Sequence, residues 1–366
     1  MQLSILRDQK IPSKLGGNSS DLYFCTSLAM SGLPKLITLY WSLRRHCLSN
    51  FVIWVICDGD DVYKAIHKLR LENINLVYLR EIEAWDQDIL RVKGDRNPFE
   101  YNCTLRPCMM KYLITLNPQI TFLTYFDTDI YFLSDPSPIY DEYENASILL
   151  TPHRYSRYVR LMGITSHKSG VYNAGWLAFK NNNIGLEALG WWRDRCIEWC
   201  RDIYEDGKYG EQKYLDELYE RFNGAVAIHH GANVGPWNIS DFQLNVDHIG
   251  QLYVDEKKLY FYHFHALKIS NDESFKVSQN LGFHTTQRTN PSYIITPRQK
   301  KLIYAPYIRE LKKALDLTGS LFIQHGRTYN SQSTSILVLI KNKIKQKALR
   351  IYGITCFLLT LFRTKK

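Results

Sequence analysis

Apolar residues in the first third of the chain gather in short runs separated by polar and turn-forming residues. The runs of strand length are 21–26, 51–57, 74–79 and 121–126. The segments between them with helical spacing are 33–47, 61–72 and 104–116. The run 51–57 is apolar throughout, which is typical of a strand buried on both faces. Strands that alternate with helices in this order predict an α/β fold with a mainly parallel sheet and crossover helices.

The second half of the chain predicts further elements around one large domain. Helical spacing covers 185–203, 213–222 and 298–316, a strand-like run covers 259–265, and the polar stretch 276–296 predicts a loop. We therefore divide the 366 residues into four parts. These are a lead-in (1–20), a main domain (21–275), a C-terminal extension packed on that domain (276–335) and a basic amphipathic tail, expected to be helical (336–366).

Polar residues lie at the ends of three predicted strands. Thr26, Asp58 and Asp127 each stand where such a strand ends. Ligands of open α/β sheets bind beyond the carboxyl ends of the strands. We therefore expect the three side chains to converge on one rim of the sheet, where Thr26 and Asp58 would contact a substrate.

Asp127 and Asp129 stand one residue apart directly after an apolar strand. Two carboxylates at this spacing can reach one hard cation, and Mn²⁺ or Mg²⁺ would keep open positions for phosphate oxygens. A departing diphosphate needs such neutralisation, because negative charge grows on it as its bond breaks. The spacing also fits a turn that merely ends a strand, and a second triplet, Asp58-Gly59-Asp60, shows that the bare pattern is weak evidence.

Other phosphate-handling classes fit the sequence less well. Phosphatases of the haloacid dehalogenase type also place an Asp-x-Asp triplet after a strand, but they usually carry Thr or Val where this chain has Tyr131. The chain has neither a Walker A loop nor a dinucleotide-binding Gly-x-Gly-x-x-Gly motif. These absences argue against kinases, ATPases and dehydrogenases.

The sequence resembles nucleotide-sugar transferases of the GT-A fold, in particular bacterial enzymes related to the lipooligosaccharide galactosyltransferase and glycogenin group. The likeness spans residues 21–270 and depends on motifs that occur in the expected order. These motifs are Thr-Leu-Arg-Pro at 104–107, Phe-Asp-Thr-Asp with its Asp-Pro continuation at 126–136, Thr-Pro-His-Arg at 151–154, Tyr-Asn-Ala-Gly at 172–175, Gly-Glu-Gln with a following Leu and Asp at 210–216, the segment 230–238, and Phe-Tyr-His-Phe-His at 261–265. The resemblance implies a Rossmann-like GT-A catalytic domain over 21–275.

The resemblance also implies residues that bind the sugar donor. Arg106 would contact the nucleotide, and Lys268 would hold a diphosphate oxygen. Asn173 and Gly175 would form the loop around the donor sugar. Each residue also has an ordinary structural explanation, since Arg and Lys are common on protein surfaces and Asn and Gly are common in turns.

Two expected parts of the site depart from the usual pattern of the family. Glu211 and Gln212 would lie near the reacting sugar carbon as catalytic residues, but the family usually has Asp where this chain has Glu211. The usual His-x-x-Gly-x-x-Lys pattern appears with a second His, with Ala in place of Gly, and with the Lys one position early. The third metal ligand would be His263 or His265. Spacing leaves both open, because residues two apart on a strand share a face.

The activity that the resemblance implies is metal-dependent transfer of a hexose from a nucleotide diphosphate sugar, a UDP-sugar, to a hydroxyl. The acceptor would be a cell-surface glycan or a lipid-linked molecule, as in lipopolysaccharide biosynthesis, and the anomeric configuration would be retained. Two alternatives stay open. A hydrolase of nucleotide sugars or phosphates could use the same metal pair, and an inactive membrane-associated binding protein could keep the fold, since Glu211 departs from the family pattern.

The composition is typical of a folded protein of a reducing compartment. Hydrophobic residues make up 45% of the chain and charged residues 22%, which supplies a sizeable core. The 8 Cys residues form no Cys-x-x-Cys pair, so reduced core thiols are the simplest interpretation. The N-terminal segment has no apolar core of signal-peptide length and no apolar span of about 20 residues. We therefore expect the protein in the cytoplasm.

The net charge of +10 is concentrated in the tail. Residues 341–366 carry 8 Lys and Arg residues and no acid, so the main domain gives no sign of nucleic-acid binding. The tail joins this charge to apolar runs at 336–340 and 351–362, a combination that suits the surface of an anionic membrane. We expect a peripheral position on the inner face of the cell membrane. The alternative is a helix docked on the main domain.

Deleting residues 336–366 should release the protein from membranes. Each Lys or Arg at an anionic surface contributes about 1 kcal/mol, so the deletion removes most of the expected attraction. The measurement is the share of full-length and shortened protein that sediments with vesicles containing an anionic lipid. Full-length protein that stays in the supernatant would contradict the membrane assignment.

Overall fold

The computed structural model describes residues 21–161, 163–228, 230–265, 267–269, 275–277, 293 and 295–324. The lead-in (1–20) and the basic tail (336–366), for which the sequence made predictions, lie outside the described residues. The same holds for most of the polar stretch 276–296.

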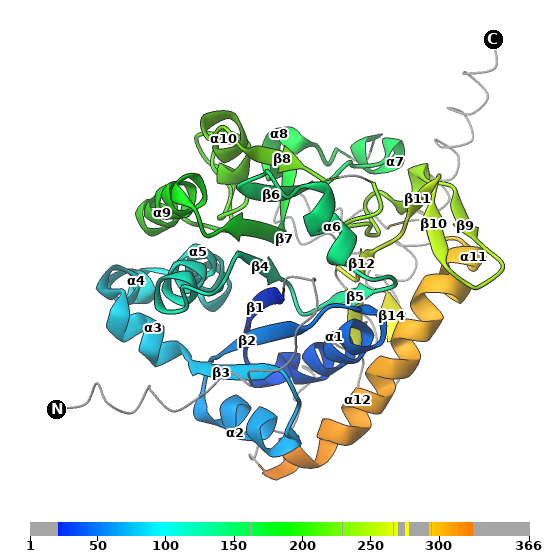
Figure 1. Ribbon diagram of the computed structural model, residues 1–366, viewed down its shortest axis with the longest axis horizontal. Coiled ribbons are helices and arrows are strands. Elements are labelled where there is room, and N and C mark those ends of the chain that lie inside the picture. Colours follow the sequence, from blue (N-terminus) through cyan, green and yellow to red (C-terminus); the bar gives the residue numbers. More distant parts are fainter. Residues whose placement is uncertain are drawn as a thin grey trace, which may run out of the picture.

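A seven-stranded sheet forms the centre of the molecule, in the order β3-β2-β1-β4-β7-β6-β8 (Figure 1). Its strands are β1 (Leu22–Leu28), β2 (Phe51–Cys57), β3 (Ile74–Tyr78), β4 (Phe122–Phe126), β6 (Ile148–Pro152), β7 (Tyr172–Lys180) and β8 (Ala225–Ala227). Four of the six strand pairs are parallel, whereas β7 runs antiparallel to both β4 and β6. The expected α/β class with a mainly parallel sheet is confirmed.

Helices cover both faces of this sheet, so the molecule has three layers (Figure 1). One face packs against α1 (Leu33–His46), α2 (Asp60–Leu69) and α6 (Ser137–Glu142). The other packs against α3 (Leu79–Trp85), α4 (Gln87–Val92), α5 (Pro98–Leu116), α9 (Asn183–Glu198) and α10 (Tyr214–Arg221). In β2, Ile53 and Val55 face the first set of helices, while Trp54 and Ile56 face the second. The strand is therefore buried on both faces, as its apolar run predicted.

Helix α5 begins at Pro98 rather than at the predicted residue 104. The Asn97 side chain accepts hydrogen bonds from the N–H groups of Phe99 and Glu100, both at 3.0 Å. Glu100 Oε2 in turn accepts from the N–H of Asn97 at 3.0 Å. This capping box satisfies backbone donors that a helix start leaves free, and proline suits the first helical position. The four residues Asn-Pro-Phe-Glu were the sequence signal that we missed.

Strands β6 and β7 were also missing from the sequence prediction. The motif Tyr-Asn-Ala-Gly at 172–175, expected as a loop, forms the first half of β7. Its pairing with β6 shifts register between Leu150 and Thr151, after which Thr151 lies opposite Asn173. Asn, Ala and Gly are depleted in strands, so only the pairing with neighbouring strands makes this segment extended.

A second, two-stranded sheet joins distant parts of the chain. Strand β5 (Ile130–Phe132) pairs antiparallel with β12 (Phe261–His263), and Ile130 lies opposite His263.

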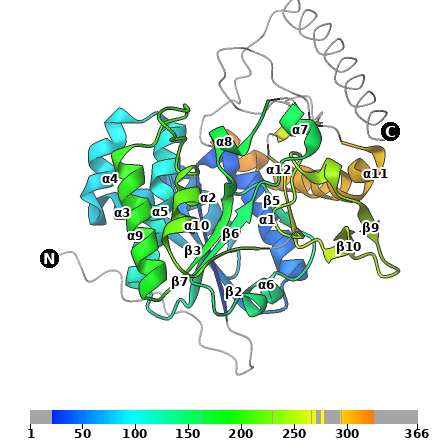
Figure 2. The same ribbon diagram turned by 90° about the horizontal axis from the view of Figure 1, so that it is seen from above.

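The helix expected at 298–316 is longer in the structure: α11 (Pro297–Gln299), the π-helix η5 (Lys300–Tyr304) and α12 (Ala305–Gln324) follow one another, and α12 lies along α1 (Figure 2). The remaining short elements are η2 (Met30–Gly32), η3 (Lys93–Asp95), α7 (Arg157–Leu161), α8 (Ser166–Ser169), η4 (Ile239–Asp241), β9 (Leu244–Val246), β10 (Leu252–Val254), β11 (Lys257–Lys258), β13 (Leu267–Ile269) and β14 (Phe275–Val277).

The cysteines of the described residues carry free thiols. The residues concerned are Cys25, Cys47, Cys57, Cys103, Cys108, Cys196 and Cys200. Cys356 lies outside the described residues. Within the described ranges, every helix is too short or too polar to cross a membrane.

Replacing Asn97 with alanine should destabilise the fold by about 1 kcal/mol, because the first turn of α5 loses its cap. The measurement is the free energy of unfolding from urea denaturation. Lys64→Ala on α2, an exposed position away from a helix start, is the control and should change stability by less than about 0.5 kcal/mol. Equal stability of the Asn97 variant and wild type would contradict a capping role.

Candidate functional site

The paired aspartates lie in the turn between β4 and β5, beside the end of β12. One ligand atom each from Asp127, Asp129 and His263 can be chosen so that all lie within 4.8 Å of one another. His263 Nε2 is 3.0 Å from Asp129 Oδ1 and 3.7 Å from Asp127 Oδ2. Among the described residues, this is the one cluster of metal-ligating side chains with such geometry.

Neighbouring groups fix the orientation of the His263 ring. Its Nδ1 is 3.3 Å from Asn233 Oδ1, and its Nε2 faces the two aspartates. With a cation bound at Nε2, the ring would donate its Nδ1–H to Asn233. Trp237 packs edge-on against the ring, with centroids 5.1 Å apart. On the far side, a Cβ added to Gly175 would lie 2.3 Å from His263 Cε1. Glycine at this position therefore leaves room for the His263 ring.

The chemistry of this cluster fits a divalent cation. Two carboxylates and one imidazole nitrogen are donors that divalent metal ions accept. Lys35, in the first turn of α1, is 3.6 Å from Asp129 Oδ2. Burial alone would raise the pKa of Asp129, but Lys35 and His263 hold it well below its usual range. Asp129 is therefore ionised and ready to ligate a cation at neutral pH.

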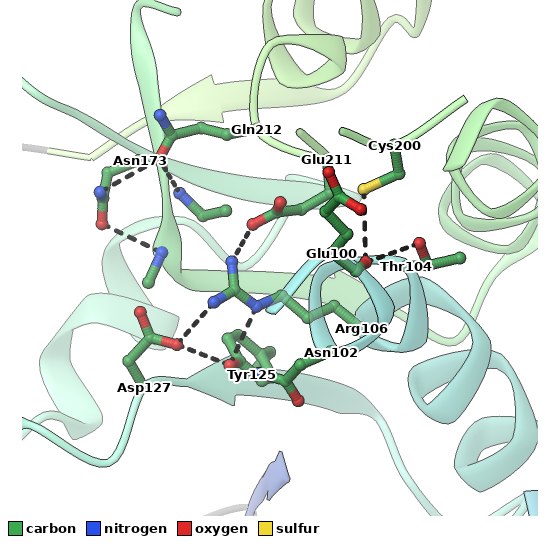
Figure 3. Close-up of polar contacts among 12 residues, drawn as sticks. Glu100, Asn102, Thr104, Arg106, Tyr125, Asp127, Asn173, Cys200, Glu211 and Gln212 are labelled. Carbon is green, nitrogen blue, oxygen red and sulfur yellow. Dashed lines mark hydrogen bonds and ion pairs between the residues drawn. The ribbon is translucent and has the colours of Figure 1, made fainter. Parts of the chain in front are cut away.

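Arg106 lies at the centre of a buried group of charges next to the cluster (Figure 3). Its Nη2 donates to Asp127 Oδ1 at 3.0 Å, its Nε donates to the Tyr125 hydroxyl at 3.0 Å, and its Nη1 pairs with Glu211 Oε1. The Tyr125 hydroxyl also donates to Asp127 Oδ1 at 2.6 Å. Burial would lower the pKa of Arg106, but Asp127 and Glu211 raise it well above its ordinary value.

A second hydrogen-bond network joins the start of β7 to the segment before α10. Gln212 Oε1 accepts from the Ala174 N–H at 3.1 Å and from Asn173 Nδ2 at 3.2 Å (Figure 3). Gln212 Nε2 donates to the Ser169 carbonyl at 2.6 Å. Asn173 Oδ1 accepts from the Gly175 N–H at 3.0 Å. The Gln212 amide is thereby held in one orientation. Asn173 and Asn233 connect it by hydrogen bonds to His263 of the metal cluster.

His153 extends this network as a neutral group. Its Nδ1 lies 3.2 Å from the Gly170 carbonyl, and its Nε2 lies 3.2 Å from Asn173 Nδ2. The carbonyl contact favours a proton on Nδ1, which leaves Nε2 to accept from Asn173. Burial lowers the pKa of His153 to about 3, so its charge does not change at physiological pH.

Two cavities open beside these groups. The first, of about 280 Å³, is lined by Phe99, Glu100, Cys103, Arg106, Asp127, His153, Tyr155, Asn173, Gly175, Cys200, Arg201, Asp202, Tyr209, Gly210, Glu211, Gln212, Trp237, His263, His265 and Tyr293. The second, of about 490 Å³, is lined by Ser27, Leu28, Ala29, Ile56, Asp58, Leu79, Lys93, Arg96, Pro98, Phe99, Tyr101, Asn102 and Leu105. Because Phe99 lines both, the two cavities adjoin at the N-terminus of α5.

The predicted rim residues are only partly brought together. Asp58 is exposed and lines the second cavity, while Asp127 lines the first. The prediction for Thr26 as a strand-end residue is wrong, because β1 continues to Leu28. Thr26 lies inside the sheet with a buried hydroxyl, and the residues after it line the second cavity.

Two of the predicted binding residues remain apart from the cluster. His265 lines the first cavity, but its ring centroid is 6.1 Å from that of His263 and it supplies no atom to the described metal cluster. Burial, with His263 next in importance, lowers the pKa of His265 to about 4. Lys268 lies in β13, where its backbone pairs with Lys276, and its side chain is outside what the structure describes.

Sequence reasoning missed three residues that shape the site. Tyr125 bridges Arg106 and Asp127, and its position two residues before Asp127 near the end of the strand was the available signal. Asn233 contacts His263 Nδ1 and belongs to the segment 230–238, within which the sequence assigned no role to a single residue. Lys35 gave no signal, because a lysine in a first helical turn is ordinarily a surface residue.

The comparison with known proteins decides the family. The protein YfnD of Bacillus subtilis (strain 168), described as uncharacterized, is 31% identical over 306 residues, which cover 83% of this chain and 93% of YfnD. The chain belongs to the YfnD family. YfnF of the same strain, also described as uncharacterized, is 29% identical over 300 residues, covering 80% of this chain and 94% of YfnF. No protein-family profile matches the chain.

Solved structures similar to this YfnD-family chain include two glycosyl-transferring enzymes, the class that the sequence motifs resemble. An active-site mutant of LgtC matches with a TM-score of 0.44 and 15% identity, covering 66% of this chain and 86% of that one. Apo mouse xyloside xylosyltransferase 1 matches with a TM-score of 0.43 and 12% identity, covering 66% of this chain and 97% of that one.

Gly175→Ala in this YfnD-family chain should weaken Mn²⁺ binding by at least about tenfold, because the new methyl group would displace the His263 ring. Isothermal titration with Mn²⁺ measures the change. Gly190→Ala on α9 is the matched control, since nothing lies within 4 Å of the added Cβ. That variant should bind Mn²⁺ normally and gain about 0.5–1 kcal/mol of stability. Normal Mn²⁺ affinity of the Gly175 variant would refute this account of the glycine.

Proposed function

We propose that the protein is a metal-dependent hexosyltransferase that moves a sugar from a nucleotide diphosphate donor, a UDP-sugar, to a hydroxyl of a cell-surface glycan or lipid-linked acceptor. The observation that carries the proposal is the convergence of Asp127, Asp129 and His263 beside the buried Arg106 at a cavity. Such a constellation suits a reaction in which a diphosphate departs.

The charges of the site explain why a metal would be required. Three carboxylates, those of Asp127, Asp129 and Glu211, face two cations, Arg106 and Lys35. A diphosphate entering this site would meet net negative charge and be repelled. Mn²⁺ or Mg²⁺, when bound, supplies the two positive charges that bring the diphosphate close and stabilise it as it leaves.

The two adjoining cavities suggest how the donor would lie. The larger one, at the carboxyl ends of β1 and β2, has the volume and the polar groups for a nucleoside, among them Asp58 and Asn102. Phe99, half-exposed at the junction, offers an aromatic face for a base. The smaller cavity, beside the metal cluster, would then hold the hexose and the acceptor hydroxyl. This arrangement agrees with ligand binding beyond the carboxyl ends of strands.

Gln212 and Glu211 would act differently on the sugar. The Gln212 amide is fixed by Ala174, Asn173 and Ser169, so it can present a defined dipole to the anomeric carbon without reorganising. Glu211 is committed to Arg106 and would act by holding that guanidinium toward Asp127. Retention of anomeric configuration is part of the proposal and depends on the resemblance of the motifs.

The proposal extends to the parts of the chain that surround the domain. Residues 21–275 would form the catalytic domain, 276–335 an extension packed on it, and 336–366 a membrane-surface tail. A basic and apolar tail would hold the enzyme at the inner face of the cell membrane, close to a lipid-linked acceptor. His265 would line the cavity that holds the sugar, and Lys268 would lie close to the diphosphate, as the sequence motif suggests.

A panel of nucleotide sugars tests the proposal. Wild-type protein with Mn²⁺ should bind one of them, measured as a metal-dependent thermal shift, and should transfer its sugar to an acceptor, measured by mass spectrometry. Asp129→Ala should reduce turnover by at least about a thousandfold, because the diphosphate loses its neutralising cation. Asp60→Ala is the control, since Asp60 belongs to the other Asp-x-Asp triplet and pairs on the surface with Arg80; it should keep full activity.

Two results would count against the proposal. Binding of no nucleotide sugar in the presence of Mn²⁺ would exclude a transferase of this kind. Release of free sugar at the full rate without any acceptor would favour the hydrolase alternative. In contrast, ¹H NMR of the first product formed would report the anomeric configuration and test retention separately.

A further inference from the structure

The sheet that carries the metal ligands has two faces with different partners. In β12, His263 and Phe261 point to one face, and Tyr262 points to the other. On β5, Tyr131 lies opposite Tyr262 and shares its face. The first face carries His263 of the metal site and packs against the core of the seven-stranded sheet. The second face packs against the C-terminal helical segment, α11 to α12.

Aromatic side chains of the C-terminal segment hold the residues on both sides of His263. The Tyr304 hydroxyl is 2.8 Å from the Tyr262 hydroxyl. The Tyr307 ring stacks on Phe264 with centroids 3.7 Å apart and planes 8° apart. Because Tyr262 and Phe264 flank His263 in the chain, these two contacts hold the backbone that carries the histidine.

The same contacts reach the aspartates. The Phe264 N–H donates to the Asp129 carbonyl at 2.8 Å, so the residue stacked under Tyr307 also anchors the backbone of a metal ligand. Tyr131 lies two residues after Asp129 and meets the Tyr307 ring edge-on at 5.5 Å. Burial raises the pKa of Tyr307 well above its ordinary value, and the charge of Asp129 adds to this effect. Through Phe264 and Tyr131, Tyr307 therefore supports the chain next to His263 and next to Asp129.

Two features show that this packing is specific. The Tyr304 position ends the π-helix η5, a distortion that often marks functional sites in helices. Arg45 of α1 donates to the Tyr131 hydroxyl at 3.0 Å and pairs with Glu310 of α12. Helices α1 and α12 therefore both contribute to the position of Tyr131. Helix α1 also contributes Lys35, which lies beside Asp129.

We propose that the C-terminal helical segment positions the metal ligands, with Tyr307 as the principal positioning residue and Tyr304 as its partner. The proposal deepens the proposed metal-dependent function and depends on it. Tyr307 touches neither metal nor substrate and acts through Phe264 and Tyr131. Its hydroxyl is buried and has no hydrogen-bond partner among the described residues, so its effect comes from the packing of the ring.

The test measures the affinity for Mn²⁺ alone, from the electron paramagnetic resonance signal of free Mn²⁺. Tyr307→Ala removes the stacked ring and should raise the Kd for Mn²⁺ at least about tenfold, the range seen when groups behind metal ligands are removed. Tyr307→Phe keeps the ring and should stay within about twofold of wild type. Loss with alanine and rescue with phenylalanine would be the signature of positioning by packing.

A matched control separates positioning from general loss of stability. Ile66→Ala deletes a buried side chain from α2, a helix that packs on β2 and β3. It should lower the melting temperature but leave Mn²⁺ affinity within about twofold of wild type. An equal loss of affinity in this variant would overturn the proposal. If Tyr307→Ala does not fold, Tyr307→Leu, which fills the space without a planar ring, is measured against the same criteria.

The remaining outcomes distinguish this proposal from the proposed function. Wild type that binds Mn²⁺, together with a folded Tyr307→Ala variant of unchanged affinity, would overturn the positioning role alone. Wild type that binds no Mn²⁺ would overturn the positioning role and the metal-dependent function together. Loss of affinity in Tyr307→Phe as large as in Tyr307→Ala would overturn the packing mechanism, because the hydroxyl would then be the active group.

Discussion

The buried ion pairs of Arg106 hold together the three segments that form the candidate site. Arg106 comes from the middle of α5, Asp127 from the end of β4, and Glu211 from the segment before α10. A buried cation is tolerated only with well-placed counter-charges, and removing one partner of such a pair costs about 3–5 kcal/mol. The three segments therefore cannot move independently. The Glu211 backbone is further tied to α9, since its carbonyl accepts from Trp192 Nε1 at 2.9 Å.

How much of the fold the sequence could predict depends on how local the evidence is. The strand 51–57 was predictable because seven apolar residues in a row fit a strand buried on both faces and are too few for a typical helix. The start of α5 was predictable in principle, since its capping box lies within four residues. Strand β7 was not, because its Asn, Ala and Gly residues favour turns locally and its extended state depends on pairing with β4 and β6.

The site shows the same division between local and long-range evidence. Asp127 and Asp129 were recognisable from their strand and spacing, and the ordered motifs suggested His263 and Glu211. Spacing could not separate His263 from His265, because both point to the same side of the chain. What separates them is tertiary: Asn233 orients the His263 ring, and Gly175 leaves space for it. Lys35 and Tyr307 come from helices whose docking no local pattern encodes.

The departure at Glu211 has a physical consequence for the choice between an enzyme and an inactive binding protein. That alternative arose because the family usually has the shorter Asp there. In the structure, the longer side chain is 4% exposed and its carboxylate pairs with the Arg106 guanidinium. The extra methylene is therefore accommodated inside the charged group, and Asp127 keeps its own bond to Arg106. Because the substitution leaves the metal cluster and the Gln212 network intact, it gives no physical reason for lost activity.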